Sequence, residues 1–423
     1  MNIAAVLCGL AWKSLWSRRG TAFLTVVSLA IGVALVLGVD RLREEARASF
    51  ANTVSGVDLI VGARSGPIAL LLYSVFRIGN ATNNISWAAY RRIAEHPDVA
   101  WAVPLSLGDS HRGYRVIGTE RGYFQHYRFG KRERLAFAAG GPFEDLFDAV
   151  LGAEVAAALG YGLGDNIVIG HGLGAIEINK HDDRPFRVAG ILRRTGTPVD
   201  RGVHVSLAGI EAMHIDWQDG RRQGGPSLSA ERLRKLTLRP KALTAALIGL
   251  KSRFAVFTLQ REINNDRREP LLAILPGVTL QALWDLMSNA ELALAAIAIF
   301  VALAAFLGML VMLLAGLGER RREIAILRAV GARPWQVFSL ITLEAVVLTV
   351  LGLIVGLGLL YVGLVLARPV INDVYGIQIG VRGLSVRDLA YLVGFLAVGG
   401  LAGILPSYGA YRRSLVDGLI VRL

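Results

Sequence analysis

The stretch Gly318–Ala345, GERRREIAILRAVGARPWQVFSLITLEA, decides the fold because it is a charged interruption between two long apolar runs. The run before it, Ala290–Leu317, contains Glu291 as its one charged residue, and the run after it, Trp335–Ala367, contains only Glu344. About 20 apolar residues are enough for a helix to cross the hydrocarbon layer of a membrane. Both runs are therefore predicted membrane spans, joined by the charged stretch.

Two further apolar runs, Gly20–Val39 and Asp388–Pro406, predict a first and a fourth span. The first run is followed by the charged residues 40–45, where a cleaved signal peptide would have a small-residue cleavage site, which favours a retained span. Basic residues lie before the first span and after the last: Lys13, Arg18, Arg19, Arg412, Arg413 and Arg422. By the positive-inside rule, both ends of the chain are predicted to lie in the cytoplasm.

The composition agrees with a membrane protein. The chain has 423 residues, of which 53% are hydrophobic, and a formal net charge of +13. Soluble proteins are seldom so apolar. Much of the basic charge flanks the apolar runs, so it indicates a membrane protein, and no nucleic acid is expected as a partner. The single cysteine, Cys8, excludes an intramolecular disulfide.

Residues 41–285 are predicted to form a large α+β domain outside the membrane, with a β-rich insert. The predicted helices are Ser86–Glu95, with Ser86 as its N-cap, and Ala153–Leu159, which Gly160 ends. The predicted strands are Gly56–Gly62, Tyr114–Thr119, Asn166–Gly170, Ala175–Asn179, Phe186–Leu192 and Val203–Leu207. The polar, glycine-rich segment Gln218–Ala230 is expected to be mobile.

All seven histidines belong to this outside domain: His96, His111, His126, His171, His181, His204 and His214. No pair has the i, i+4 spacing of a helical zinc site, and HExxH is absent, so we expect no metal. The chain also has no G-x-x-x-x-G-K-[ST] phosphate-binding loop and no G-x-S-x-G elbow. We therefore expect no enzyme activity and no cofactor in this chain.

The predicted organisation is an α-helical membrane protein with four transmembrane helices and a large α+β extracytoplasmic domain between helices 1 and 2. Its segments are 1–19, a cytoplasmic amphipathic helix; 20–40, the first span; 41–285, the outside domain; 286–317, a stalk and second span; 318–334, a cytoplasmic coupling helix; 335–367, the third span; 368–387, a short outside loop; 388–406, the fourth span; and 407–423, a cytoplasmic tail.

Three features of this layout leave alternatives open. Residues 1–19 are either an interfacial helix, with Trp12 and Trp16 at headgroup level, or a plain positive flank. The third apolar run is longer than a bilayer requires, so it must tilt, break near its glycines or protrude. The patterns Gly352-x-x-x-Gly356 and Gly399-Gly400-x-x-Gly403 allow helices to approach closely, either between subunits or within the chain.

From Pro276-Gly277 onward, a continuous helix would carry the second span out of the bilayer as a stalk.

The charged stretch itself has the pattern of a short docking helix. Ile324, Leu327 and Gly331 fall on one helical face, and arginines fall on another. Gly331 suits the C′ position that ends a helix, and Pro334 suits the first turn of the next one. Glu344 is predicted either to pair with an arginine of this helix or to lie at the headgroup boundary.

The sequence ERRREIAILRAVGA, with Glu344-Ala345 ten residues after Pro334, resembles the signature of MacB/FtsX-type permeases, the membrane subunits of ABC transporters that include macrolide exporters and lipoprotein-releasing complexes. Leu151–Glu154 with Leu159-Gly160 and Gly164-Asp165 resembles their periplasmic core domain, and PSYGAYRRS at 406–414 their closing P-A-x-x-A-x-R. Ser407 stands where alanine is usual, and Ser414 where proline is common.

The resemblance implies a permease in the bacterial inner membrane that couples ATP hydrolysis by a separate cytoplasmic ATPase to movement of its periplasmic domain, exporting or extracting a periplasmic or lipidic substrate. An FtsX-like regulator without transport is the alternative. The implied partners are an ABC ATPase, which binds the ATP, a second permease copy, a periplasmic accessory protein and membrane lipid. The predicted docking residues are Glu319, Arg320, Arg321, Arg322, Glu323, Ile324, Leu327, Arg328 and Gly331, and Glu344 is the predicted intramembrane polar residue.

Overall fold

The computed structural model describes residues 3–53, 55–171, 178–180, 184–215, 217–218, 221–222, 229–319, 321–375, 380 and 382–412. The chain divides into two compact units, which we describe separately. The helical unit contains Met1–Glu45, Ser288–Asn372 and Ile379–Leu423, and the sheet unit contains Ala46–Met287 and Asp373–Gln378.

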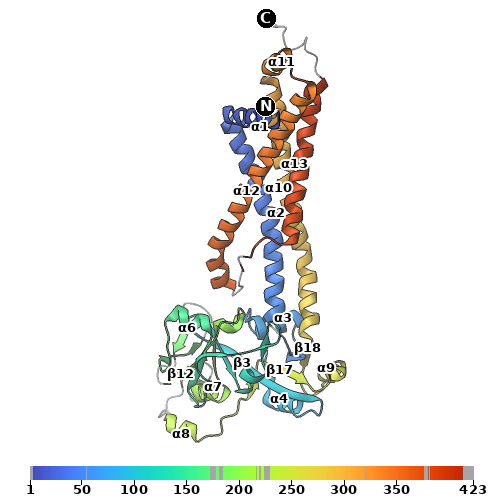
Figure 1. Cartoon of the computed structure of the whole chain (residues 1–423). Helices are drawn as coiled ribbons and strands as arrows, with labels where there is room; N and C mark the ends of the chain where they lie inside the picture. Colours follow the sequence, from blue (N-terminus) through green and yellow to red (C-terminus); the bar gives the residue numbers. More distant parts are fainter. Residues whose placement is uncertain are drawn as a thin grey trace. The chain divides into compact units, whose positions relative to one another are not determined.

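The helical unit is built from long apolar helices (Figure 1). Its helices are α1 (Ile3–Ser17), α2 (Arg19–Thr53), α10 (Pro276–Glu319), α11 (Arg321–Ala329), α12 (Pro334–Tyr375) and α13 (Val386–Arg412). Four of them, α2, α10, α12 and α13, are long and apolar enough to cross a membrane. The predicted fold class, with four spans and a large α+β domain between the first and second, is thus confirmed.

All four long helices extend beyond their predicted spans, and α10 and α12 are the longest. As the sequence predicts, α10 is one continuous helix from Pro276 into the second span. Helix α12 also runs unbroken for 42 residues, past all its glycines. It ends at Tyr375, so the first part of the predicted outside loop, 368–387, is helical, and Pro369 lies inside the helix. An unbroken helix therefore replaces both the break near the glycines and the beginning of the loop.

The glycine patterns serve contacts within the chain. A Cβ atom added to Gly352 would lie 2.7 Å from Leu29 Cβ, and one on Gly356 would lie 2.8 Å from Val33 Cβ. Real Cβ atoms do not come so close to other carbons, so there is no room for a side chain at either glycine. The backbone of α12 therefore packs directly against α2 at both positions. Gly403 of α13 is equally close to α12. The described residues thus use these glycines for packing inside one chain.

Helices α2 and α10 pack antiparallel to each other in the helical unit. The Cβ position of Gly32 lies 3.2 Å from Ala302 Cα, and Arg43 Nε lies 2.8 Å from Glu291 Oε2. The step from Gly32 to Arg43 along α2 equals the step from Ala302 back to Glu291 along α10, so both contacts belong to one register.

The sheet unit is organised on a mixed sheet of twelve strands. Their order along the main path is β18-β1-β17-β3-β4-β13-β8-β12-β7. Beside it pair β9 (Asn166–Ile167), β10 (Gly170–His171) and β11 (Ile178–Lys180). The bounds along this path are Leu271–Ile274, Leu59–Ala63, Ala245–Leu250, Val99–His111, Tyr114–Thr119, Gly202–Ser206, Asp148–Leu151, Phe186–Leu192 and Phe137–Gly140. The pairs β12·β8 and β13·β4 are parallel, and the other pairs on the path are antiparallel.

Several predicted helices and strands of this unit are confirmed, including the residues that begin or end the helices. Helix α4 (Trp87–Ala94) follows Ser86, whose Oγ accepts a hydrogen bond from the amide of Ala89 at 3.1 Å. Helix α6 (Ala153–Leu159) ends at Gly160, which has a φ of +70°. The predicted strands at 114–119 and 186–192 match β4 and β12. Most of Gln218–Ala230 and part of Ala175–Asn179 lie outside the described residues.

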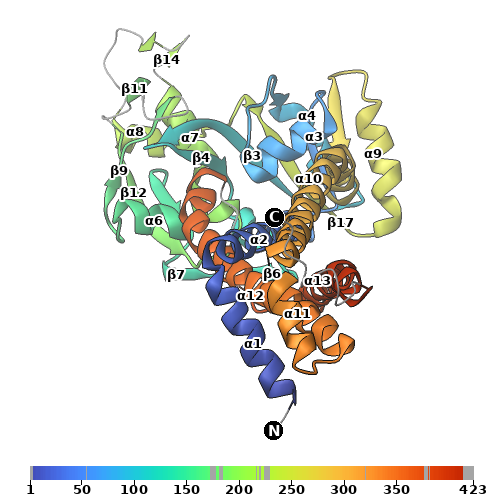
Figure 2. The same ribbon diagram turned by 90° about the horizontal axis from the view of Figure 1, so that it is seen from above.

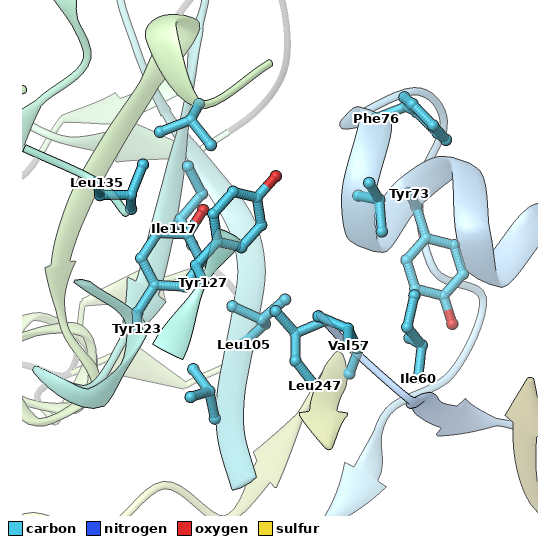
Figure 3. Packing of buried hydrophobic residues seen from close by; sticks show 14 of the residues in the cluster. Val57, Ile60, Tyr73, Phe76, Leu105, Ile117, Tyr123, Tyr127, Leu135 and Leu247 are labelled. Atoms are coloured by element: carbon cyan, nitrogen blue, oxygen red, sulfur yellow. The ribbon is translucent and has the colours of Figure 1, made fainter. Parts of the chain in front are cut away.

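Side chains alternate between two faces of the sheet and bury an apolar core on each. On β1, Ile60 joins the first core, whereas Leu59 and Val61 join a second core on the other face. The first core also contains Tyr73 and Tyr127 (Figure 3). Helix α4 and helix α9 (Val256–Asn264) cover the second core, and a third core lies on the same side under α6 and α7 (Leu207–His214). Both faces of the sheet are thus covered.

The edge strand β18 is closed by a side chain. Asn264, the last residue of α9, accepts a hydrogen bond from the amide of Ala273 at 2.6 Å and donates one to the Ala273 carbonyl at 3.3 Å. Gln260 Nε2 donates to the same carbonyl at 3.1 Å. The outward-facing groups of Ala273 are therefore already bonded.

Candidate coupling site at α11

Helix α11 ends in the way that its sequence predicts. Gly331 has a φ of +106°, a left-handed conformation that favours glycine. Its amide donates to the Arg328 carbonyl at 3.1 Å, and the Ala332 amide donates to the Leu327 carbonyl at 2.9 Å. These two bonds make a Schellman motif, which turns the chain sharply toward Pro334, the first residue of α12. The predicted roles of Gly331 and Pro334 in the fold are confirmed.

One face of α11 packs against the bundle. Ile324 contacts an apolar cluster of Leu317 from α10 and Val337 and Ile341 from α12. The neighbouring Ala325 is 5% exposed. Ile324 was predicted as an apolar anchor for a partner, but its side chain faces the chain's own helices. It therefore fixes α11 to α10 and α12.

The opposite face of α11 is apolar and exposed. Ile326 is 51% exposed and Val330 is 85% exposed, and the two lie one helical turn apart. Leu327, a predicted anchor, is 36% exposed beside them. The sequence prediction missed Ile326 and Val330 because apolar residues occur on both sides of this helix. The signal available was their i, i+4 spacing, which marks them as one face.

The predicted charged residues of the docking site divide into two groups. Glu323 is exposed and lines a small cavity beside α11, and Arg328 is half-buried. Arg320 lies outside the described residues, and so do the side chains of Glu319, Arg321 and Arg322. Their predicted role in docking stays a prediction.

The cavity lies where α1, α10, α11 and α12 meet, and it has a volume of about 30 Å³. That volume holds about one water molecule. Glu344 of α12 lines it and is 6% exposed, so this carboxyl group is buried inside the helical unit. The arginine that lines the same cavity is Arg18, between α1 and α2, and no arginine of α11 is among the lining residues described.

Arg18 also ties this end of α2 to α10. Its Nη2 donates a hydrogen bond to the Gly316 carbonyl at 3.1 Å, and a Cβ atom on Gly316 would collide with the guanidinium. The chain changes direction at this point, between the end of α1 and the start of α2. Figure 2 shows α1 lying across the direction of the long helices. Trp12 and Trp16 of α1 are 53% and 64% exposed. The interfacial role predicted for residues 1–19 stays a prediction.

A polar cluster binds the helices at the other end of the helical unit. Its centre is Arg41 of α2, whose Nη2 lies 2.7 Å from Asp388 Oδ2 and 3.2 Å from the Gly383 carbonyl. The guanidinium carbon lies 5.1 Å from the ring centroid of Tyr361 on α12. The side chains of Arg41 and Asp388 are 11% and 4% exposed. We call Arg41, Tyr361, Gly383 and Asp388 the Arg41 cluster.

Asp388 is held in place by the start of α13. It accepts a hydrogen bond from the Ser385 amide at 2.8 Å, and the Asp388 amide donates to Ser385 Oγ at 3.1 Å. This reciprocal pair is a capping box, which satisfies two free amides of the helix end. Further ion pairs surround the Arg41 cluster: Arg387 with Glu44 and Asp40, Arg382 with Glu45, and Arg43 with Glu291.

Two family models match the sequence. One is described as the MacB-like periplasmic core domain and matches residues 22–248, more than half of the chain; the other is described as the FtsX-like permease C-terminal domain and matches residues 295–415. The chain belongs to the MacB/FtsX-type permeases. The second match contains α11, the cavity lining from α10, α11 and α12, and the Arg41 cluster's contacts on α12 and α13.

Among known proteins, this permease is similar to the macrolide export ATP-binding/permease protein MacB of Nitrobacter winogradskyi. The two are 24% identical over 424 residues, which cover 94% of this chain and 57% of that protein. The chain thus spans little more than half the length of this relative.

Two solved structures are also similar. The periplasmic region of MacB from Actinobacillus actinomycetemcomitans shares 10% identity, covering 55% of this chain and 94% of that one, with a TM-score of 0.35. The extracellular domain of the ABC-type transporter YknZ from Gram-positive bacteria shares 11% identity, covering 51% of this chain and 98% of that one, with a TM-score of 0.29.

Proposed function

We propose that this permease binds a cytoplasmic ABC ATPase through α11 and transmits ATP-driven movement of that ATPase to its extracytoplasmic sheet unit. The observation that carries the proposal is the two-sided packing of α11. Ile324 fixes one face to α10 and α12, while Ile326 and Val330 present an apolar face that the described residues leave uncovered. A helix joined firmly to two spans and apolar on its outer face is suited to receive force from a partner.

The family supports an ATPase as the partner. The Nitrobacter relative is named as an ATP-binding/permease protein, and the phosphate-binding loop motif does not occur in the 423 residues of the printed sequence. By the positive-inside rule, the basic flanks of the spans support a cytoplasmic location for α11 and both chain ends in a bacterial inner membrane. A second permease copy would complete the assembly, because ABC ATPases act in pairs.

The substrate is proposed to be periplasmic or lipidic, and to be exported or extracted by movement of the sheet unit. The four candidate spans offer little for an ion-driven carrier, because their ionisable residues gather near the helix ends. Glu344 is the exception, and it lines a cavity that holds about one water molecule. Work done by an ATPase on the cytoplasmic side explains these spans better than ion movement through them.

Docking can be tested by placing charge on the exposed face of α11. We expect the double substitution Ile326→Asp and Val330→Asp to abolish co-purification of a P-loop ATPase and its stimulation by the permease, because a carboxylate resists burial in an apolar contact. Leu327→Asp should act in the same direction. The matched control is Val386→Asp at the start of α13, since Val386 is also 86% exposed. Unchanged ATPase binding by the double variant would refute docking through α11.

A further inference from the structure

The end of α2 and the start of α10 meet inside the sheet unit around one aromatic side chain. The ring centroid of Phe50, on α2, lies 5.4 Å from that of Trp284 on α10, with the rings nearly perpendicular. On its other side, the Phe50 ring lies 4.3 Å from Phe76, at the end of the short helical segment Leu72–Phe76. Trp284 and Phe76 are each 8% exposed. One residue therefore touches the second helix and the core together.

The remaining contacts fix the last turn of α2 to the same core. Tyr127 donates its hydroxyl hydrogen bond to the Thr53 carbonyl, and the Ser55 amide donates to the Arg128 carbonyl at 3.1 Å. The Tyr127 ring stacks on Tyr123 at 5.0 Å, and Tyr123 is fully buried. Figure 3 shows Phe76 and the two tyrosines on separate segments of this one core. Helix α2 thus has its own anchor, independent of Phe50.

Helix α10 is connected to the sheet through β18 and also contacts Phe50. It begins two residues after β18 ends, and Leu280 packs against the first core while the Trp284 ring contacts the Phe50 ring. The guanidinium of Arg47, one turn before Phe50, also lies 5.6 Å from the Trp284 ring. Rings that pack edge to face contribute about 0.5–1.5 kcal/mol beyond the area that they bury. Trp284 is thus a point where α2 contacts α10 in this unit, through both Phe50 and Arg47.

We propose that Phe50 is a positioning residue, which makes α2 and α10 act on the sheet as one body. Within the sheet unit, the Phe50–Trp284 contact joins the last turns of α2 to the first turns of α10. A displacement of either helix is then delivered through Phe50 to Phe76 and the first core. This inference rests on the proposed function, because it names the residue through which ATP-driven movement reaches the sheet.

The first test needs no ATPase. Hydrogen exchange is measured on the full chain in lipid nanodiscs, for the wild type and for Phe50→Ala. We expect exchange to rise about tenfold or more in Leu72–Phe76 and at the start of α10, because a core truncation loosens its neighbours locally. Helix α6, in the third core, should not change. The control is Phe254→Ala in the same unit, since Phe254 is 94% exposed. An equal rise in α6, or no rise at either segment, would overturn the proposal.

The second test measures coupling in the complex with the ATPase. Cys8→Ser leaves no native thiol, so spin labels can be placed at Glu262→Cys and Val386→Cys, one in each unit. We expect ATP with vanadate to shift the distance between the labels in the wild type, and Phe50→Ala to lose the shift while ATP hydrolysis stays within about twofold. Phe50→Leu, which keeps an apolar side chain, should retain part of the shift.

The two tests separate this inference from the function on which it rests. If no ATPase associates with the wild type, the proposed function fails, while hydrogen exchange still decides whether Phe50 joins the two helices to the core. If the ATPase associates and the label distance shifts in Phe50→Ala as in the wild type, the positioning role is wrong and the proposed function stands.

Discussion

The two ends of the helical unit are held by different kinds of contact. At one end, the Arg41 cluster joins α2, α12 and the start of α13 by a buried guanidinium, a carboxylate in a capping box and a ring of ion pairs. At the other end, α11 packs by Ile324 against a few apolar side chains beside a cavity of about 30 Å³. The first end is held mainly by ion pairs and hydrogen bonds, whereas at the second end apolar packing is joined by the hydrogen bond from Arg18 to the Gly316 carbonyl.

This difference indicates which end can move. Charge-assisted hydrogen bonds lose much of their strength when their geometry changes, so the Arg41 cluster favours a single arrangement of the helices. Apolar contacts have no preferred direction and tolerate a small shift of α11 at low cost. Under the proposed function, this compliant contact would lie where the ATPase binds.

The largest expected effect comes from the firm end. Arg41→Ala leaves the buried Asp388 carboxylate without its guanidinium, and breaking a buried ion pair in this way costs about 3–5 kcal/mol. We expect a lower midpoint of thermal unfolding in nanodiscs. Arg43→Ala is the control, because the Arg43 side chain is 44% exposed and such pairs contribute about 1 kcal/mol or less. Equal effects of both substitutions would mean that the buried Arg41–Asp388 pair stabilises the fold no more than the exposed Arg43–Glu291 pair does.

A smaller loss is expected at the compliant end. Leu317 is 6% exposed and contacts Ile324, so Leu317→Ala should cost about 2 kcal/mol, at the low end for leucine truncation because the site opens toward the surface. The same variant should increase proteolysis within α11 in nanodiscs and leave α13 protected. Equal exposure of both helices would show that the two ends are not independent.

The pH dependence of stability is expected to come in part from two buried histidines of the sheet unit. Burial is the main cause that lowers the pKa of His204 to about 3, with the nearby Arg77 charge adding to it. In the unfolded chain His204 therefore takes up a proton near pH 6.5, whereas in the folded unit it stays neutral at that pH. The free energy of unfolding falls as the pH falls below that value. Between pH 7 and 5, the loss is about 2 kcal/mol.

His214 acts in the opposite direction. Its burial lowers the pKa, but the hydrogen bond and charge of Asp109, together with Glu211, outweigh burial and raise it. The stability from His214 is therefore fully present below its unfolded pKa and is lost as the pH rises through the folded one. Denaturant unfolding followed at pH 5 and 7 should show less acid destabilisation in His204→Gln and more in His214→Gln. The same slope in all three proteins would contradict these assignments.

The smallest effect on stability is expected on the exposed face of α11. Ile326→Ser should change the free energy of unfolding by less than about 0.5 kcal/mol, because the side chain is half exposed. The same substitution should weaken ATPase binding measurably, whereas Val386→Ser should not. A large loss of stability in Ile326→Ser would show that this face of α11 is covered in the folded chain and is not available to a partner.

The sequence predicts the helices of this permease better than their contacts. Apolar length locates the four spans, and the chemistry of Ser86, Gly160 and Gly331 locates helix ends, because these features are local. The inward direction of Ile324 could not be predicted, because it depends on where α10 and α12 place their side chains. The same is true of Arg41, whose partner Asp388 lies at the far end of the chain and was predicted only as the first residue of a span.

The bond between Asn264 and the edge strand β18 bears on how the protein reaches its fold. A chain that is threaded through a membrane emerges unfolded beside other copies, and an open strand edge can recruit one of them. Asn264 lies nine residues before Ala273, so it reaches the edge as soon as this short hairpin of helix and strand forms. The amide side chain then occupies the bonding positions of Ala273 that a foreign strand would take, and this edge of the sheet is protected by a residue of its own chain.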